Sequence, residues 1–332
     1  MLPLPIGRYL TSLGAVNDYY RLKGVSEKSS AYCTDKHLFH KTLAQQGLRN
    51  SEHFLVPCGA EKFSEDISSI HYPVIVKPRF GSGNRAVKVY QNSNELKKQF
   101  IRNMPYEEDF IIESCIAGIE YGVDAAIIDG EFYLILLREK LLTPYPYRQC
   151  VGYLSVINNN DNSKLINSVI EKISNAGKII GLEHCLLHAD IIFDGQDIFI
   201  IEMSARPAGH YLHNIFTPIA TGVDMISEYV KSSLPQLNHK YSFKPEYTKC
   251  LLIKYFDFSE KHIATVPNKN FICEKYPIKA YECNLEDGVF LHRVTDGHSI
   301  MGRGYYIVEG NNRDELIGIS NEIERHFITE SR

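Results

Sequence analysis

Short apolar runs separated by polar turn signals divide the chain into strands and helices of ordinary length. Residues 72–77 and 87–90 show strand patterns, whereas residues 164–180 carry apolar positions at helical spacing. Thr34 is a candidate N-cap for a helix, and Asp129-Gly130 separates two strand-like runs as a tight hairpin turn would. Hairpin-linked strands interleaved with helices predict an α+β fold with mixed or antiparallel sheets.

The stretch 186–209, LLHADIIFDGQDIFIIEMSARPAG, predicts two buried strands joined by a turn at Asp194-Gly195. Asp190 and Glu202 lie an even number of residues apart, so both side chains can point to one face. If the loop centres on Gln196, the two carboxylates stand opposite each other and repel. A divalent cation such as Mg²⁺ would remove that cost. The alternatives are a two-residue loop, which would offset the pair, and two solvated carboxylates on an exposed face.

A glycine-bearing segment, GSGNRA from Gly81 to Ala86, fits the pattern of dinucleotide-binding turns. Such a turn opens directly into a helix, but the residues that follow it alternate like a strand. A strand–glycine loop–strand arrangement instead indicates a flap whose N–H groups can close over phosphates. Lys77, at the end of the preceding strand, would place an ammonium beside them. A strand-end lysine that reaches into solvent is the alternative.

Composition narrows the class of protein. The 332 residues are 44% hydrophobic and 23% charged, enough for two or three lobes with a sizeable core. A net charge of -4 gives no electrostatic basis for binding nucleic acid or an anionic membrane. No apolar run reaches the length of a membrane span, and the N-terminus does not resemble a signal peptide. The eight cysteines include no CxxC pair. We therefore expect a cytoplasmic protein with reduced thiols.

Three stretches resemble, in order, the motifs of the ATP-grasp superfamily: VIVKPRFGSGNRAV, IIESCIAGIEYGVDA and HADIIFDGQDIFIIEMSARPAG. The likeness is strongest to carboxylate–amine ligases, in particular L-amino-acid ligases, and runs from about Asp35 to the C-terminus. It implies an ATP-grasp fold, in which two α+β lobes grip ATP. The expected organisation is a remnant of a largely missing N-terminal α/β domain at 1–33, a small lobe with the glycine flap at 34–116, a large lobe with the metal site at 117–235, and its C-terminal part at 236–332.

The resemblance also implies a role for each matching residue. Lys36 and Lys77 resemble the two lysines that bind the ATP phosphates, and Glu120 resembles the carboxylate that binds the ribose. The other ATP-contacting residues belong to the phosphate flap, which includes Gly81, Ser82 and Gly83, and to the hinge that pairs with the adenine edge, which comprises Glu113, Ser114, Cys115 and Ile116. Asp190 and Glu202 resemble the Mg²⁺ ligands, with Mn²⁺ as an alternative ion. Ser204 stands where relatives have a metal-ligating Asn, and Ala86 where they have a flap Gly. Arg206, with Lys77, would stabilise the transferring phosphoryl group.

The activity implied is ATP-dependent ligation of a small carboxylic acid or amino acid to an amine, through an acyl-phosphate, with release of ADP and phosphate. Partners implied are these substrates, and either a homodimer or a protein that supplies the N-terminal domain. Two alternatives remain: a purine-pathway or carboxylase-type ATP-grasp enzyme, and a nucleotide-binding subunit without catalysis.

Several residues allow two readings. His184, His188 and Asp190 share a strand face and allow a zinc site, although no further ligand completes the set. Arg138 is either a substrate or ATP contact or part of a structural ion pair. The remaining candidates are substrate contacts or ordinary loop residues: Tyr145, Tyr147, Arg148, His210, His213 and Arg303.

Overall fold

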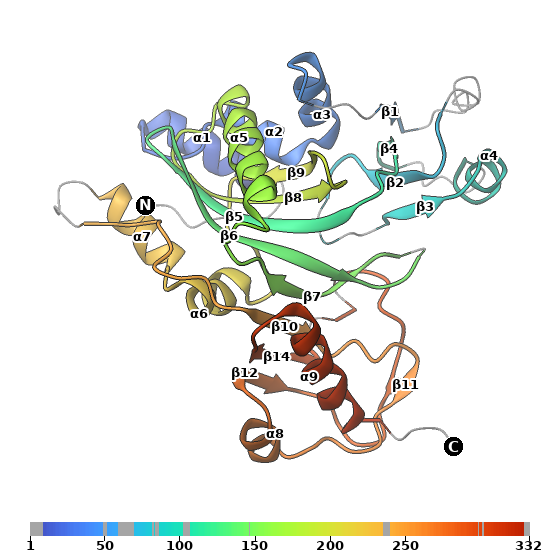
Figure 1. Ribbon diagram of the computed structural model, residues 1–332. Helices are drawn as coiled ribbons and strands as arrows, with labels where there is room; N and C mark the ends of the chain where they lie inside the picture. The colour runs from blue at the N-terminus through green and yellow to red at the C-terminus, as the bar shows by residue number, and fades with distance from the viewer. Residues whose placement is uncertain are drawn as a thin grey trace.

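The computed structural model describes residues 9–48, 52–58, 70–81, 83, 86–101, 107–145, 147–234, 240–297, 299–300 and 302–328. Helices and strands are interleaved along these parts of the chain (Figure 1). Every strand pairing described is antiparallel, so the predicted α+β class with antiparallel sheets is confirmed.

Eight strands form the larger sheet, in the order β12-β14-β10-β7-β6-β5-β8-β9. They are β5 (Ile119–Ile128), β6 (Glu131–Leu142), β7 (Cys150–Ser155), β8 (Cys185–Phe193), β9 (Ile198–Ser204), β10 (Leu251–Tyr255), β12 (Ile278–Cys283) and β14 (Gly304–Glu309). Asp129 and Gly130 join β5 to β6 with positive φ at both residues. This is the backbone that a tight hairpin turn requires, so the predicted turn is confirmed.

The middle of this sheet has one apolar face and one polar face. Val123 of β5 and Ala189 of β8 are fully buried in a core that they share with α5 (Ser163–Ile179). Because successive side chains of a strand point to opposite faces, His188 and Asp190 lie on the other face. The apolar face supplies packing, and the polar face is left to carry charged groups.

The β8–β9 hairpin has the register that the sequence predicts, but reaches it by a different route. Phe193 pairs with Ile198 across the turn, and a bulge farther from the turn inserts Ile201 on β9. Past the bulge, Asp190 lies directly opposite Glu202. The expected cross-strand pair of carboxylates is therefore confirmed.

Three N-terminal helices, α1 (Tyr9–Tyr20), α2 (Glu27–Thr34) and α3 (Lys36–Gln45), precede the sheets. The prediction that Thr34 caps a helix is wrong, because Thr34 is the last residue of α2. The α3 cap is Asp35, whose carboxylate accepts the Leu38 N–H at 3.1 Å. Arg79 also donates two hydrogen bonds to this carboxylate, at 2.9 and 2.6 Å. It thereby connects α3 to the segment that follows the strand Val74–Pro78.

The smaller sheet has four strands in the order β1-β4-β2-β3: β1 (His53–Val56), β2 (Val74–Pro78), β3 (Lys88–Tyr90) and β4 (Phe110–Ser114). One face packs on a helical segment, α4 (Ser93–Glu95) with the π-helical turn Leu96–Phe100. The glycine segment connects β2 to β3, so a strand does follow it. The dinucleotide-binding alternative, which needs a helix there, is thereby excluded.

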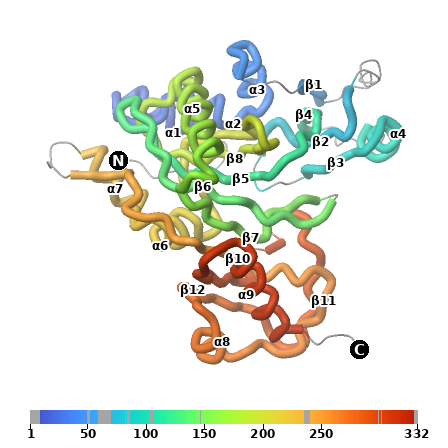
Figure 2. Tube along the Cα trace, viewed as in Figure 1, coloured from blue at the N-terminus to red at the C-terminus, as the bar shows by residue number. Residues whose placement is uncertain are grey.

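The remaining elements cover and extend the larger sheet. They are a π-helical turn Leu212–Phe216, α6 (Thr217–Thr221), α7 (Met225–Ser233), α8 (Lys269–Lys275), α9 (Arg313–Arg325) and the two-stranded pair β11 (Lys261–His262) and β13 (Phe290–Leu291). The strands β10, β12 and β14, together with α8 and α9, lie at the opposite end of the molecule from α3 and the small sheet (Figure 2).

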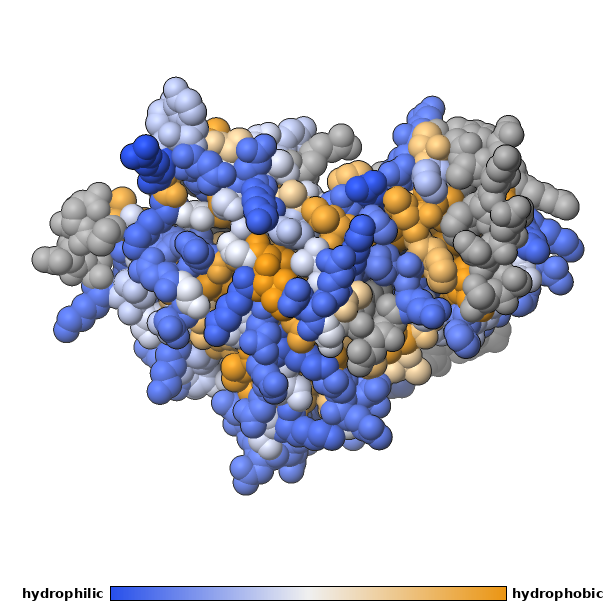
Figure 3. All heavy atoms as spheres, turned by 90° about the horizontal axis from the view of Figure 1, so that it is seen from above, coloured by the Kyte–Doolittle hydropathy of each residue, from blue (hydrophilic) through white to orange (hydrophobic). Residues whose placement is uncertain are grey.

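Seen from above, polar and charged side chains cover most of the molecule, and apolar groups show as separate patches (Figure 3). Within the part of the chain that the structure describes, no helix combines the length and apolarity of a membrane span.

Candidate active site

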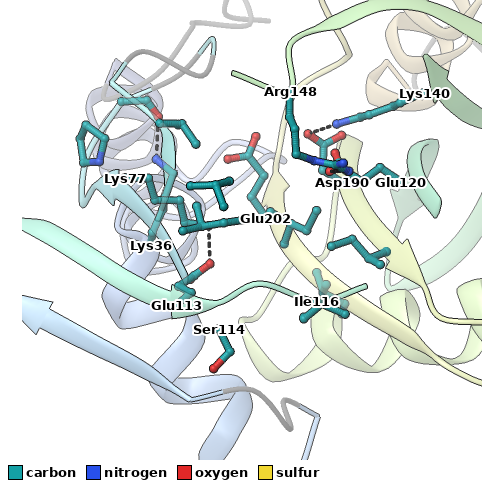
Figure 4. A pocket seen from close by; sticks show the side chains of 18 of the residues that line it. Lys36, Lys77, Glu113, Ser114, Ile116, Glu120, Lys140, Arg148, Asp190 and Glu202 are labelled. Carbon is teal, nitrogen blue, oxygen red and sulfur yellow. Dashed lines mark hydrogen bonds and ion pairs between the residues drawn. The ribbon is translucent and has the colours of Figure 1, made fainter. Parts of the chain in front are cut away.

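A pocket lies between the small sheet and the polar face of the large one (Figure 4). Charged side chains enter it from both sides: Lys36, Lys77, Glu113, Glu120, Lys140, Arg148, Asp190 and Glu202. Aliphatic side chains form its other walls: Ile75, Val87, Val89, Ile116, Ile192 and Ile200. The structure thus brings together ten of the residues predicted from sequence, now including Gly81, Gly83 and Ser114.

On the small-sheet side, Lys77 is held in the pocket wall by a chain of ionic contacts. Its Nζ lies 2.8 Å from Glu113 Oε2, and His40 Nε2 lies 2.7 Å from Glu113 Oε1. All three residues are buried, so Lys77 is not a lysine that reaches into solvent. A buried ammonium needs a fixed partner, and Glu113 supplies it while the pocket side stays open.

Lys36, the first residue of α3, brings a second ammonium to the same wall. Its Nζ donates to the Gly81 carbonyl at 2.8 Å, which ties it to the start of the glycine segment. Burial lowers the pKa of Lys36; Glu202 opposes that shift, and Lys77 adds to it. Lys36 therefore feels both a neighbouring cation and a carboxylate from the opposite sheet.

The glycine segment lies over one side of the pocket. Gly81 and Gly83 line it, whereas Ser82 lies outside the described residues. Ala86 has φ +56°, a left-handed backbone that is costly for a residue with a Cβ. Gly83 also accepts a hydrogen bond from the N–H of Gly297, at 3.0 Å, so the C-terminal part of the chain reaches the flap.

On the large-sheet side, Asp190 and Glu202 both line the pocket, and Glu202 projects into the space between the two groups of charges (Figure 4). Asp190 Oδ2 lies 2.6 Å from Lys140 Nζ. Its other oxygen, Oδ1, makes no hydrogen bond with a described residue, although His188 Nε2 lies 3.4 Å away. Burial alone would raise the pKa of Asp190, but Lys140 and His188 hold it below its ordinary value.

These carboxylates fit a metal that takes few protein ligands. Within the described residues, no three His, Cys, Asp or Glu side chains are grouped as a metal site would require. Mg²⁺ is usually held by one or two carboxylates together with substrate phosphates, so Asp190 and Glu202 with a free buried oxygen suit it. Ser204 pairs with His188 in the hairpin but is not among the residues that line the pocket.

His184 does not take part in the zinc site that the sequence allowed. His184 lies 3.3 Å from Asp129 and 3.1 Å from the hydroxyl of Ser233, away from the pocket residues. His188 instead contacts Asp190 and the buried Asp124. The two histidines thus serve different contacts, and zinc is not supported.

The hinge after β4 offers one backbone donor to a ligand. The N–H of Ser114 points to the Glu52 carbonyl at 3.4 Å, and that of Cys115 to the Pro73 carbonyl at 2.9 Å. Ile116 lines the pocket, and no bond from its N–H to a described residue is present. Cys115 does not line the pocket, so among these residues Ile116 is the one that both lines it and has an N–H without a bond to a described residue.

Sequence reasoning missed Lys140 and left Arg148 undecided. Both line the pocket. Lys140 forms an ion pair with Asp190, and Arg148 forms one with Glu120, in which Nη2 of the arginine lies 2.8 Å from Oε1 of the carboxylate. Lys140 lies two residues beyond Arg138 on one strand, a spacing that places both on one face. That spacing was a usable signal, but β6 also carries an extra residue, Ile135, opposite the step from Asp124 to Ala125, and no pattern in the sequence predicts this bulge.

Tyr147 also lines the pocket, whereas the three remaining arginine candidates fall outside it. Arg138 is fully buried and bonds to Asp124 at 2.6 Å, which favours the structural ion pair. Arg303 donates to the Asp257 and His292 carbonyls, as a loop anchor does. Arg206 follows β9 and donates to the Pro207 carbonyl at 2.9 Å without lining the pocket.

The two histidines after Arg206 also contribute to loop packing. The His210 carbonyl accepts the Tyr255 hydroxyl at 2.6 Å, and His213 Nδ1 lies 2.5 Å from the Ala208 carbonyl. Neither histidine lines the pocket.

The fold and this two-sided pocket define the class of protein. Residues 70–214 match the family of ATP-grasp domains, so this part of the chain is an ATP-grasp domain, and the predicted resemblance is confirmed.

Known proteins resemble the chain in sequence or in fold. D-alanine–D-alanine ligase B from Clostridium perfringens is 35% identical over 127 residues, which are 38% of this chain and 41% of that protein. The chain therefore matches less than half of that relative's length. The L-amino acid ligase from Bacillus licheniformis aligns with a TM-score of 0.76 at 15% identity, over 96% of this chain and 77% of that one. Phosphoribosylglycinamide synthetase from Anaerococcus prevotii aligns with a TM-score of 0.65 at 17% identity, over 96% of this chain and 79% of that one. At these identities the structural likeness shows the fold.

Proposed function

We propose that this protein is an ATP-dependent carboxylate–amine ligase. A carboxylate oxygen of the substrate attacks the γ-phosphorus of ATP, and ADP leaves. The amine nitrogen then attacks the acyl carbon, the phosphate departs, and the nitrogen loses its proton. The product is an amide or a peptide bond. The similarity to D-alanine–D-alanine ligase B and the fold shared with an L-amino acid ligase support this reaction class.

One observation carries the proposal: Lys36 of α3 and Lys77 of the small sheet share a single pocket with Asp190 and Glu202 of the large sheet, beside the glycine segment. Phosphoryl transfer depends on positioning and on neutralising charge, and this set supplies both. Lys36 and Lys77 would contact phosphate oxygens, with Glu113 keeping Lys77 in place. Mg²⁺, when bound between Asp190 and Glu202, would add charge neutralisation.

The rest of the pocket suits the adenosine end of ATP. Ile75, Val87, Ile116 and Ile192 give apolar walls for a base. The Ile116 N–H would donate to the adenine edge, and Glu120 would accept from the ribose hydroxyls. We also propose the lobe boundaries that the resemblance implies, with the two sheets on either side of the hinge at 116.

The test is phosphate release from ATP and Mg²⁺ by the full chain, with pools of amino acids and small carboxylic acids, each with and without an added amine. We expect release that needs both a carboxylate and an amine. Release that needs bicarbonate or a phosphorylated amine instead would support the carboxylase-type or purine-pathway alternative. ATP binding without release from any pool would support the non-catalytic alternative and overturn the proposal.

Gly297→Ala should uncouple phosphate release from amide formation. An added Cβ would lie 3.2 Å from the Gly83 carbonyl oxygen, so the flap must move away from its hydrogen bond to Gly297. A flap that closes less well admits water to the acyl-phosphate. We expect the ratio of phosphate to amide to rise roughly two- to fivefold, the factor that weakening one neutral hydrogen bond implies.

The matched control is Gly318→Ala in α9, where an added Cβ meets nothing within 4 Å. It should leave the ratio unchanged. Equal ratios for both variants would show that the Gly297 contact plays no part in flap closure.

A further inference from the structure

The connection between β6 and β7 closes on itself and turns its tip toward the pocket. The Thr143 N–H donates to the Gln149 carbonyl at 2.8 Å, and the Gln149 N–H donates to the Thr143 hydroxyl at 2.9 Å. Gln149 Nε2 also donates to the Tyr147 carbonyl at 2.9 Å. These bonds fix the base of the loop, so the direction of its side chains is set by the fold.

Arg148, which directly precedes Gln149 in this loop, has an unusual backbone. Its φ is +46°, in the left-handed region that residues with a Cβ rarely adopt. Non-glycine residues that keep such a conformation are often found where a side chain must be aimed. Here the conformation goes with a guanidinium that lines the pocket beside Glu120 (Figure 4).

The guanidinium is held from two sides. Nη2 of Arg148 lies 2.8 Å from Glu120 Oε1, and its Cζ lies 5.0 Å from the centre of the Tyr145 ring. Stacking on an aromatic ring and bonding to a carboxylate restrict both partners. Arg148 therefore fixes the orientation of the Glu120 carboxylate rather than only balancing its charge.

Glu120 keeps one oxygen for another partner. Oε1 accepts from Arg148, and Oε2 accepts no hydrogen bond from a described residue. A carboxylate with one oxygen anchored presents the other in a defined direction, whereas an unanchored carboxylate rotates. A ribose hydroxyl can donate a hydrogen bond to such an oxygen.

We propose that Arg148 is a positioning residue for the nucleotide: it anchors Oε1 of Glu120 so that Oε2 reads a ribose hydroxyl, and the β6–β7 loop thereby sets the preference for ribonucleotides over deoxyribonucleotides. This inference rests on the proposed function, because it assumes that ATP occupies the pocket. It adds to that function a residue from a different loop and a specificity that the loop controls.

The test compares ATP, 2′-deoxy-ATP and 3′-deoxy-ATP, each with Mg²⁺, by calorimetric titration of the full-length protein and its Arg148→Met variant. Methionine keeps the length of the side chain but cannot bond to Glu120. We expect the wild-type protein to bind ATP about tenfold more tightly than at least one deoxynucleotide, the factor for one hydrogen bond to a charged group. In Arg148→Met this preference should fall to about twofold or less, through weaker binding of ATP with little change for the deoxynucleotide.

Two further variants sharpen the comparison. Arg148→Lys keeps a cation that can make a single bond to Oε1, so it should restore part of the preference. Arg313→Met is the control, because Arg313 bonds to Glu139 at 2.8 Å and both lie outside the pocket lining. It should leave the preference intact. A thermal melt of each variant establishes that it is folded.

Each contrary result has a distinct meaning. Equal binding of ATP and both deoxynucleotides by the wild-type protein, or an unchanged preference in Arg148→Met, overturns the role of Arg148. Tighter binding of all three nucleotides by Arg148→Met also overturns it, since Arg148 would then block Glu120 rather than position it. If the wild-type protein binds no ATP at all, the proposed function itself fails.

Discussion

Glu202→Gln is expected to lower Mg²⁺-dependent phosphate release by roughly 10²–10³-fold, the cost of removing one group that stabilises transition-state charge. The amide cannot neutralise a cation, and the cross-strand pair with Asp190 would lose half of its charge. Glu202 makes no ion pair with a described residue, so its replacement strands no buried partner. The measurement is the rate of phosphate release under saturating substrates, over a range of Mg²⁺ concentrations.

Two further variants are compared with Glu202→Gln. Asp190→Asn should lower the rate similarly, but it also leaves the buried Lys140 without its carboxylate, so the melting temperature should fall as well. Glu286→Gln, an exposed change outside the pocket, should alter neither quantity. If Glu202→Gln kept the full rate at every Mg²⁺ concentration, the assignment of the metal site to this hairpin would be wrong.

Arg206→Ala is expected to lower the rate of phosphate release by about 10³-fold, the lower end of what an arginine contributes to phosphoryl transfer. The side chain forms a backbone bond to Pro207 and no ion pair with a described residue, so the fold should not depend on it. Arg206 lies in the chain segment directly after β9, the strand that carries Glu202. ATP affinity should change little, because the arginine would act on the transferring group.

Arg206→Lys separates charge from shape. A lysine keeps the positive charge but cannot grip a phosphate or carboxylate with two parallel hydrogen bonds. We expect it to recover only part of the lost rate, still about tenfold below the wild-type protein. Full recovery would mean that charge alone matters, and an unchanged rate in Arg206→Ala would remove Arg206 from the reaction.

Local patterns in the sequence predicted the strands and turns that frame the site. Alternation over residues 87–90 predicted a strand after the glycine segment where a dinucleotide turn needs a helix, and β3 is found there. The even spacing of Asp190 and Glu202 predicted their shared face, because side-chain direction in a strand depends only on counting residues. Their facing register also held, although a bulge at Ile201 produced it in place of the centred loop.

Contacts between distant parts of the chain were beyond that reasoning. Arg148 meets Glu120 because the β6–β7 loop turns back over the hinge, and no spacing in the sequence encodes that path. Lys140 reaches Asp190 across β5, after a bulge shifts the β5–β6 pairing by one residue. Asp35 rather than Thr34 caps α3, and its carboxylate at that position also forms an ion pair with Arg79. Each case was decided by a tertiary partner.

The division of the large sheet into an apolar and a polar face has a consequence for how this protein can change over time. The stability of the fold constrains Val123 and Ala189, whereas the pocket constrains Asp190, the immediate neighbour of Ala189. The two demands fall on alternate positions of the same strands. New substrate preferences can therefore accumulate on one face of the sheet while the core beneath it stays as it is.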